Sequence, residues 1–247
     1  MNISLVSKYL QLSFELGRLV PFLHIILEVV LNSVGKENML ASIAKVSPPI
    51  VARNFREIQS ELYRKAIHLL VAFVPLIASI DLSFTITLLG IGIIAYTYAE
   101  YLRRTGRTVF VISQLTVIAS REREIGHFVY GPITLGLGAM LALMLYPHPA
   151  ATVAIYALAF GDGFSSLLGK MFGRIRIPLT GGKTVVGSVT CFAAVFLVVI
   201  IMTNEPVTAV IIASSAMLFE ALPTKDLDNI VLPVGTGFVA SLFLTLT

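Results

Sequence analysis

Residues 159–188 read AFGDGFSSLLGKMFGRIRIPLTGGKTVVGS, a polar, glycine-rich and basic stretch between two apolar runs. One acid, Asp162, opens the stretch at the end of an apolar run, and the pair Lys183-Thr184 stands where a new helix is expected to begin. An acid that can hold a metal ion, glycines that free backbone N–H groups and a lysine at a helix start suit the phosphate tail of a nucleotide. Neither GxxxxGK[ST] nor GxGxxG is present, so the spacing alone fits a solvated basic loop between two membrane spans equally well.

The composition is that of an integral membrane protein. Of the 247 residues, 56% are apolar and 13% are charged, and the mean hydropathy is +0.89. Several apolar runs approach the ~20 residues that cross a bilayer, and helices satisfy their own backbone polar groups there. We therefore expect an all-α, polytopic transmembrane helical bundle with about seven or eight spans and a cytoplasmic glycine-rich nucleotide loop. The composition excludes a soluble domain, and the single Cys191 excludes a disulfide within the chain and a cysteine metal site.

The apolar runs predict one membrane-embedded domain over residues 51–247. An N-terminal segment, residues 1–50, is expected to contribute one span or one interfacial helix. Residues 108–119 are too short to cross and are placed along the interface. The run 150–160 extends only ~17 Å as a helix, so Asp162 should lie below the headgroup level in a protein-lined cavity. The expected crossings are residues 66–80, 82–98, 128–146, 150–160, 184–202, 208–219 and 230–246.

Charge is distributed unequally between the two sides of this predicted bundle. Residues 32–65, 100–127, 162–183 and 220–229 hold 16 of the 18 Lys and Arg residues, and the turns on the other side hold none. Because basic residues concentrate on the cytoplasmic side, the polar motifs should face the cytoplasm, where nucleoside triphosphates are available. The expected location is the inner membrane of a bacterium, or the endoplasmic reticulum or an organelle membrane of a eukaryote. The same topology explains the basic pI, so no nucleic-acid partner is expected.

Four polar clusters converge on the predicted cytoplasmic side. Phosphoryl transfer needs a divalent cation held by carboxylates, cations on the phosphates and a positioned nucleophile. Mg²⁺ takes one or two carboxylates besides the substrate phosphates. We therefore predict catalytic roles for Asp162, Lys183, Glu220 and Asp228, with Asp162 and Asp228 holding Mg²⁺ or another divalent cation. The clusters are Glu61/Arg64/Lys65/His68 on one helix face, Glu100 with Arg103 and Arg104, residues 162–183, and Glu220 with Asp226, Asp228 and Asn229.

Further residues are predicted to contact the nucleotide or the acceptor. Several have simpler interpretations: Arg64 and Lys65 as anchors beside lipid headgroups, His68 as a packing residue, and Glu100 as an ion-pair partner of Arg103 or Arg104 at a helix end. The residues expected near the acceptor are Glu61, His68, Glu100 and Asn229. The predicted nucleotide and phosphate contacts are Arg64, Lys65, Gly161, Gly163, Gly169, Gly173, Arg176, Thr184, Gly187 and Ser188.

These motifs resemble the nucleotide loop of the CTP-dependent lipid-alcohol kinases, a family that includes dolichol, phytol and farnesol kinases and the fungal-type diacylglycerol kinase. The resemblance covers residues 61–233. It implies a polytopic helical enzyme that transfers the γ-phosphate of CTP to a lipid hydroxyl with a divalent metal. The matching residues are Phe160-Gly161-Asp162, Gly169, Gly173, Ile175-Arg176, Pro178, Lys183-Thr184, Gly187-Ser188, Arg64-Lys65, His68, Glu220, Asp228-Asn229 and Pro233. The chain departs from the family at Gly182, often a lysine, and at Val186, often a glutamate.

The implied acceptor is a polyprenol or dolichol, a phytol- or farnesol-type isoprenoid, or diacylglycerol. Two alternatives remain. A phosphatidate cytidylyltransferase resembles the same loop, but that family ends in a His-Gly-Gly and Asp-Arg-x-Asp signature, where this chain has Asp228-Asn229-Ile230-Val231-Leu232-Pro233. A lipid or solute transporter without catalysis usually carries ionisable groups inside its spans, whereas residues 128–160, 184–202 and 230–246 contain only His148. The expected partners are a nucleoside triphosphate, the lipid substrate and, in a homodimer, a second copy of the chain.

Overall fold

A computed structural model describes Glu61 and residues 63–107, 127–224 and 227–244. The expectations for residues 1–50, for an interfacial helix at 108–119 and for Asp226 lie outside this part of the chain. The described residues form helices joined by turns, and the one β-type pairing among them is an isolated antiparallel bridge between Arg176 and Thr184. The expectation of an all-α fold is confirmed over this part.

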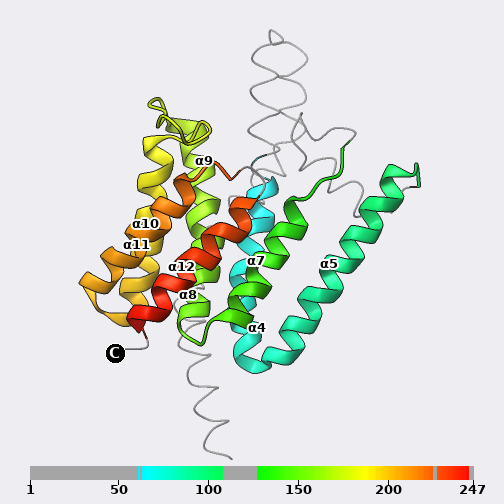
Figure 1. Cartoon of the computed structure of the whole chain (residues 1–247), viewed down its shortest axis with the longest axis horizontal. Coiled ribbons are helices and arrows are strands. Elements are labelled where there is room, and N and C mark those ends of the chain that lie inside the picture. Colours follow the sequence, from blue (N-terminus) through cyan, green and yellow to red (C-terminus); the bar gives the residue numbers. More distant parts are fainter. Residues whose placement is uncertain (1–60, 62, 108–126, 225–226, 245–247) are drawn as a thin grey trace, which may run out of the picture. The chain divides into compact units, whose positions relative to one another are not determined.

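The helices run up and down the bundle in chain order (Figure 1). Four are long and apolar enough to cross a membrane, namely Tyr63–Ile80, Leu82–Arg104, Ala150–Phe172 and Val185–Thr203. Three shorter apolar helices accompany them, so length supports four crossings in the described residues where seven or eight were expected of the whole chain. The elements are η1 (Val71–Phe73), α4 (Val74–Ile80), α5 (Leu82–Arg104), α7 (Gly131–Leu145), α8 (Ala150–Tyr156), η3 (Ala157–Asp162), α9 (Gly163–Phe172), α10 (Val185–Thr203), α11 (Pro206–Ala221) and α12 (Asp228–Leu244).

Short polar signals set the helix ends. Asp81 lies in an extended conformation between α4 and α5, and its side chain accepts a hydrogen bond from the backbone N of Phe84 at 2.8 Å. Thr184 begins α10 in the same way, since its hydroxyl accepts from the N of Gly187 at 3.2 Å. Such N-caps satisfy backbone N–H groups that the first helical turn leaves unpaired. The predicted hairpin at Asp81 and the predicted helix start at Lys183-Thr184 are both confirmed.

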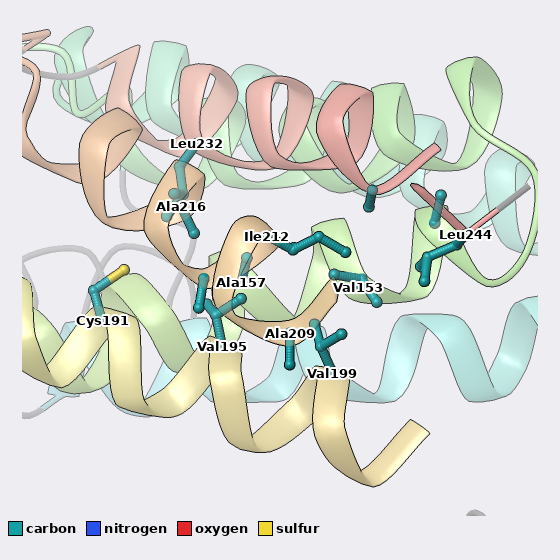
Figure 2. Packing of buried hydrophobic residues seen from close by; sticks show 13 residues of the cluster. Val153, Ala157, Cys191, Val195, Val199, Ala209, Ile212, Ala216, Leu232 and Leu244 are labelled. Carbon is teal, nitrogen blue, oxygen red and sulfur yellow. The ribbon is translucent and has the colours of Figure 1, made fainter. Parts of the chain in front are cut away.

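The helix Ala150–Phe172 is the centre of the bundle. In the most apolar stretch of this helix, 78% of the residues are buried, against 11% in α5. The apolar side chains of α5 point outward, as expected of a lipid-facing helix. The small residues of the central helix let neighbouring helices approach closely, as in other membrane bundles. Figure 2 shows the result: Val153 and Ala157 of the central helix lie in one cluster with Val195 of α10 and Ile212 of α11.

The central helix does not end where the sequence predicted. The apolar run was expected to stop at Phe160 and to open a long loop at Asp162, but η3 and α9 continue the helix to Phe172 and the loop begins at Gly173. Residues 161–172 contain no proline, and their polar side chains find partners inside the bundle, so tertiary contacts outweigh the weak helix propensity of glycine. Asp162 is therefore an interior residue of the helix and only 3% exposed, which confirms that it lies in a protein environment.

Several glycines of the 159–188 stretch serve packing between helices. A Cβ built at Gly173 would lie 2.4 Å from the hydroxyl oxygen of Thr184, and one at Gly187 would lie 2.9 Å from the carbonyl oxygen of Ser165. These contacts let α9, the loop and the start of α10 pack tightly. Gly181 and Gly182 instead adopt positive φ angles of 70° and 104°, which a turn formed by residues with side chains rarely reaches.

Replacing Gly138 by alanine should destabilise the bundle, because the new Cβ would lie 1.9 Å from the backbone oxygen of Asn229 where α7 meets α12. We expect a loss of about 2–3 kcal/mol in the free energy of unfolding. Cys191 is fully buried and is the chain's single cysteine, so its modification by a thiol-reactive fluorophore on heating reports unfolding. Gly92→Ala on α5 is the matched control, since nothing lies within 4 Å of its Cβ position. Equal unfolding temperatures for the two variants would contradict the packing described.

Candidate active site

One face of the helix that includes Tyr63–Ile80 carries charged side chains into the bundle. Glu61, Lys65 and His68 are each no more than 4% exposed, whereas Arg64 keeps part of its surface accessible. The spacing i, i+4 and i+7 places the three buried residues on one side of a helix. The prediction that they share a face is confirmed.

The side chains of Lys65 and His68 on this face point toward the carboxylate of Asp162. Its Oδ2 pairs with the ammonium of Lys65 and lies 3.2 Å from Nδ1 of His68, and its Oδ1 accepts a hydrogen bond from the hydroxyl of Ser166 at 3.2 Å. All four groups sit inside the bundle or at its edge. A buried carboxylate is tolerated only when opposite charge and hydrogen bonds replace its lost hydration. The contacts to Asp162 therefore join Tyr63–Ile80 to the central helix.

Glu61 forms a second buried ionic group, with Arg64 on its own helix and Lys170 on α9. Burial alone would raise the pKa of Glu61, but the charges of Arg64, Lys65 and Lys170 lower that pKa to about 2. Glu61 is consequently anionic throughout the physiological range. The sequence placed Lys170 in the 162–183 cluster but predicted no contact for it, because it lies on the face of Asp162 only if the helix continues past that residue.

Glu220, at the end of α11, joins three other segments. It accepts a hydrogen bond from the ammonium of Lys183 at 2.8 Å, and from the hydroxyls of Ser165 on α9 and Ser188 on α10 at 3.4 Å each. Burial alone would lower the pKa of Lys183, but Glu220, Asp162 and Asp228 raise it, so this lysine stays protonated. Lys183 therefore presents a fixed positive charge within electrostatic reach of two further carboxylates.

Asp228, the first residue of α12, belongs to the same electrostatic environment. Burial and the charge of Asp162 raise the pKa of Asp228, against the opposing effect of Lys183, Lys65 and Arg64. Two carboxylates that disfavour each other's charge are an arrangement that a divalent cation relieves. Within the described residues no group of three His, Cys, Asp or Glu side chains gathers around one point. A pair of carboxylates still fits Mg²⁺, which completes its shell with water and phosphate oxygens.

Glu100 and Asn229 were predicted near the acceptor, but their contacts hold helices together. Glu100 forms two hydrogen bonds of 2.7 Å with Arg103 and accepts from the backbone N of Val129 at 2.9 Å, which fixes α5 to the segment before α7. This confirms the simpler interpretation of Glu100 as the partner of Arg103. The amide of Asn229 donates to the hydroxyl of Thr134 at 2.9 Å and so joins α12 to α7.

The predicted phosphate contacts divide into two sets. Arg64, Lys65 and Ser188 lie in the charged clusters around Asp162, Glu61 and Glu220. The others lie in packing, capping or surface positions: Gly161 against Cys191, Gly163 near Leu69, Gly169, Gly173 and Gly187 between helices, Thr184 as a cap, and Arg176 exposed on the loop. Sequence reasoning missed Ser165 and Ser166, which follow Asp162 by three and four residues. Helical spacing from Asp162 was the signal that would have found them.

Comparison with known proteins finds distant relatives of one kind. The chain is 25% identical over 207 residues to a probable chloroplastic phytol kinase of Triticum aestivum, an alignment that covers 76% of this chain and 69% of that protein. It is 26% identical over 199 residues to a phytol kinase of Synechocystis sp., with 73% and 78% covered. It is 24% identical over 155 residues to phytol kinase 1, chloroplastic, of Arabidopsis thaliana, with 56% and 51% covered. No family model matches the chain, and no solved structure matches it significantly.

Replacing Asp162 by asparagine should leave the ammonium of Lys65 buried without a charged partner. We expect the free energy of unfolding to fall by about 3–5 kcal/mol, the usual cost of breaking a buried pair from one side. The double variant Lys65→Met/Asp162→Asn removes both charges and should recover most of this loss. The heat-induced exposure of Cys191 measures all three proteins. A double variant no more stable than Asp162→Asn would argue against the pairing.

The low pKa of Glu61 predicts a pH dependence of stability. Its folded-state pKa of about 2 lies below the ordinary value of 4.5, so its contribution is complete above the ordinary value and is lost as the pH falls through about 2. The linked free energy is about 3 kcal/mol. Parent protein should therefore lose more thermal stability than Glu61→Gln between neutral and strongly acidic pH. Parallel pH profiles of the two proteins would disprove the assignment.

Proposed function

We propose that this chain is an integral membrane kinase that transfers the γ-phosphate of CTP to the hydroxyl of an isoprenoid alcohol of the phytol type. The observation that carries the proposal is the set of buried ion pairs within an apolar helical bundle, Lys65 with Asp162 and Lys183 with Glu220. The distant similarity to proteins named phytol kinases supports the acceptor class. The choice of CTP rests on the resemblance of the loop motifs to the CTP-dependent family.

The lengths of the helices support access by a lipid hydroxyl. Helices α7, α11 and α12 have 15, 16 and 17 residues. Their lengths of about 22–26 Å fall short of the ~30 Å hydrocarbon core. Their ends at Gly131, Ala221 and Asp228 lie at the end of the bundle where α9 ends (Figure 1). With their other ends at the opposite interface, these helices stop below the headgroup level, where the hydroxyl of a membrane-dissolved alcohol can meet the charged cluster.

In the proposed reaction, the hydroxyl oxygen of the alcohol bonds to the γ-phosphorus of CTP while the bond from that phosphorus to the β–γ bridging oxygen breaks, and CDP leaves. Asp162 and Asp228 would hold a divalent cation, which supplies charge neutralisation of the phosphate oxygens. Lys183, held by Glu220, places a fixed positive charge on the transferred phosphoryl group. We assign the nucleotide side of the site to the cytoplasm, in accordance with the distribution of basic residues.

The proton released by the hydroxyl needs an acceptor among the nearby carboxylates. Glu61 is a weak base, because its pKa is about 2 and two cations already occupy its oxygens. Asp162 is no stronger a base, because Lys65 and His68 already face its Oδ2. The loose transition state of phosphoryl transfer demands little base strength, so positioning and charge carry most of the catalysis in this proposal.

The test is transfer of label from CTP to lipid by the protein reconstituted in lipid nanodiscs. With γ-labelled CTP, we expect label in phytol, farnesol or polyprenol, and competition by unlabelled CTP stronger than by ATP or UTP. Asp228→Asn should lower the rate by about 100-fold or more. Its matched control is Asp81→Asn at the opposite end of the bundle, because asparagine also caps helices and α5 should keep its start.

Two results would reject the proposal. Absence of label from every alcohol, combined with formation of CMP-lipid from α-labelled CTP and phosphatidic acid, would identify a cytidylyltransferase. Full activity of Asp228→Asn would remove this residue from the metal site.

A further inference from the structure

The loop between α9 and α10 presents an apolar and basic surface outside the ion-paired cluster around Asp162 and Glu220. Its four apolar side chains are 50–96% exposed, and two arginines stand among them. In Figure 1 this loop projects past the ends of α9 and α10. We call it the loop surface; it comprises Met171, Phe172, Arg174, Ile175, Arg176 and Leu179.

The loop surface belongs to an ordered turn. The backbone N of Ile177 donates to the oxygen of Lys183 at 2.9 Å, the N of Val185 donates to the oxygen of Ile175 at 3.1 Å, and the hydroxyl of Thr180 donates to the oxygen of Ile177 at 2.8 Å. These bonds hold the two arms of the loop together. The exposed side chains are therefore displayed by a defined backbone, which also carries Lys183.

Leu179 is the most unusual member of the loop surface. It is 96% exposed and adopts a φ of 65°, in the left-handed region that a bulky side chain rarely occupies. Within the described part of the chain, this side chain packs against almost nothing, so no packing energy offsets the strain of its backbone. A large apolar residue held outward at such a position indicates a contact made outside the protein.

The position and charge of the loop surface point to one occupant. Phe172 ends a helix of 23 residues, long enough to cross the membrane, so the loop starts at the boundary between hydrocarbon and water. Arg174 and Arg176 are exposed, and in the described part of the chain neither forms an ion pair. Apolar side chains beside basic ones at this level suit insertion among anionic headgroups, to which each Lys or Arg adds about fivefold in binding.

We propose that the loop surface docks into the adjacent leaflet and binds anionic phospholipid, with Ile175 and Leu179 inserted and Arg174 and Arg176 on the phosphate groups. This surface is separate from the Asp162 cluster, and its lipid binding does not depend on the proposed kinase activity. Docking would also fix the backbone of Lys183, because that residue is hydrogen-bonded to the inserted arm of the loop.

The chain contains no tryptophan, so one introduced residue gives an unambiguous fluorescence probe. Leu179→Trp in nanodiscs that contain phosphatidylglycerol should emit at shorter wavelength than in pure phosphatidylcholine. It should be quenched by a lipid spin-labelled near the headgroup and protected from aqueous iodide. Adding Arg174→Gln and Arg176→Gln should reduce the ratio of docked to undocked loop on the order of 30-fold.

Two further probes complete the experiment. Ile175→Trp reports on the same surface from a second position and guards against a local effect at Leu179. Val207→Trp is the matched control, because Val207 is 70% exposed at the opposite end of the bundle, where the turns carry no Lys or Arg. The emission wavelength of this tryptophan should be the same with and without phosphatidylglycerol.

Three outcomes would overturn the proposal. Equal iodide quenching of the Leu179→Trp probe with and without phosphatidylglycerol would show that the loop remains in water. If the loop still docks after both arginines are replaced, they do not recognise anionic lipid. Shielding in detergent that disappears on dilution of the protein would identify a second copy of the chain as the occupant.

Discussion

The buried charge of Asp162 is the constraint around which the bundle is arranged. A carboxylate inside a helical membrane protein is costly unless an opposite charge lies beside it. Lys65 and His68 supply that partner from another helix, so Tyr63–Ile80 must pack against the middle of the central helix. The small residues of α8 and the glycines of α9 then allow α10, α11 and α12 to approach the same helix closely.

The polar residues at this end of the bundle carry out two different tasks. Glu100 and Asn229 join neighbouring helices through fully formed hydrogen bonds, and they define the positions of α5, α7 and α12. The groups around Asp162 and Glu220 form direct ion pairs with Lys65 and Lys183, and the charge of Asp228 adds to the same electrostatic environment. Structural pairs thus surround a cluster of buried charges, an arrangement that suits the proposed reaction because that reaction depends on electrostatics and positioning.

The sequence predicted the elements whose signals are local. The hairpin at Asp81, the start of α10 at Thr184 and the common face of Glu61, Lys65 and His68 all follow from capping and helical spacing. It failed from Gly161 to Phe172, where glycine and polar residues indicate a loop and only burial by other helices makes a helix. Ser165, Ser166 and Lys170 were missed for the same reason. The partners of Glu100 and Asn229 depend on tertiary contacts, which no local pattern specifies.

The π-helical turn η3 lies between α8 and α9 and divides the central helix into two parts along its length. A π-turn holds one residue more than an α-helical turn, so it rotates everything after it by about 100° relative to an uninterrupted helix. Before η3 the helix is almost entirely apolar, whereas from Asp162 onward one side of it carries the polar residues Ser165, Ser166 and Lys170. The one additional residue therefore sets the rotation of α9 about the helix axis. If the two parts were joined without it, the polar residues of α9 would point away from Lys65 and Glu220.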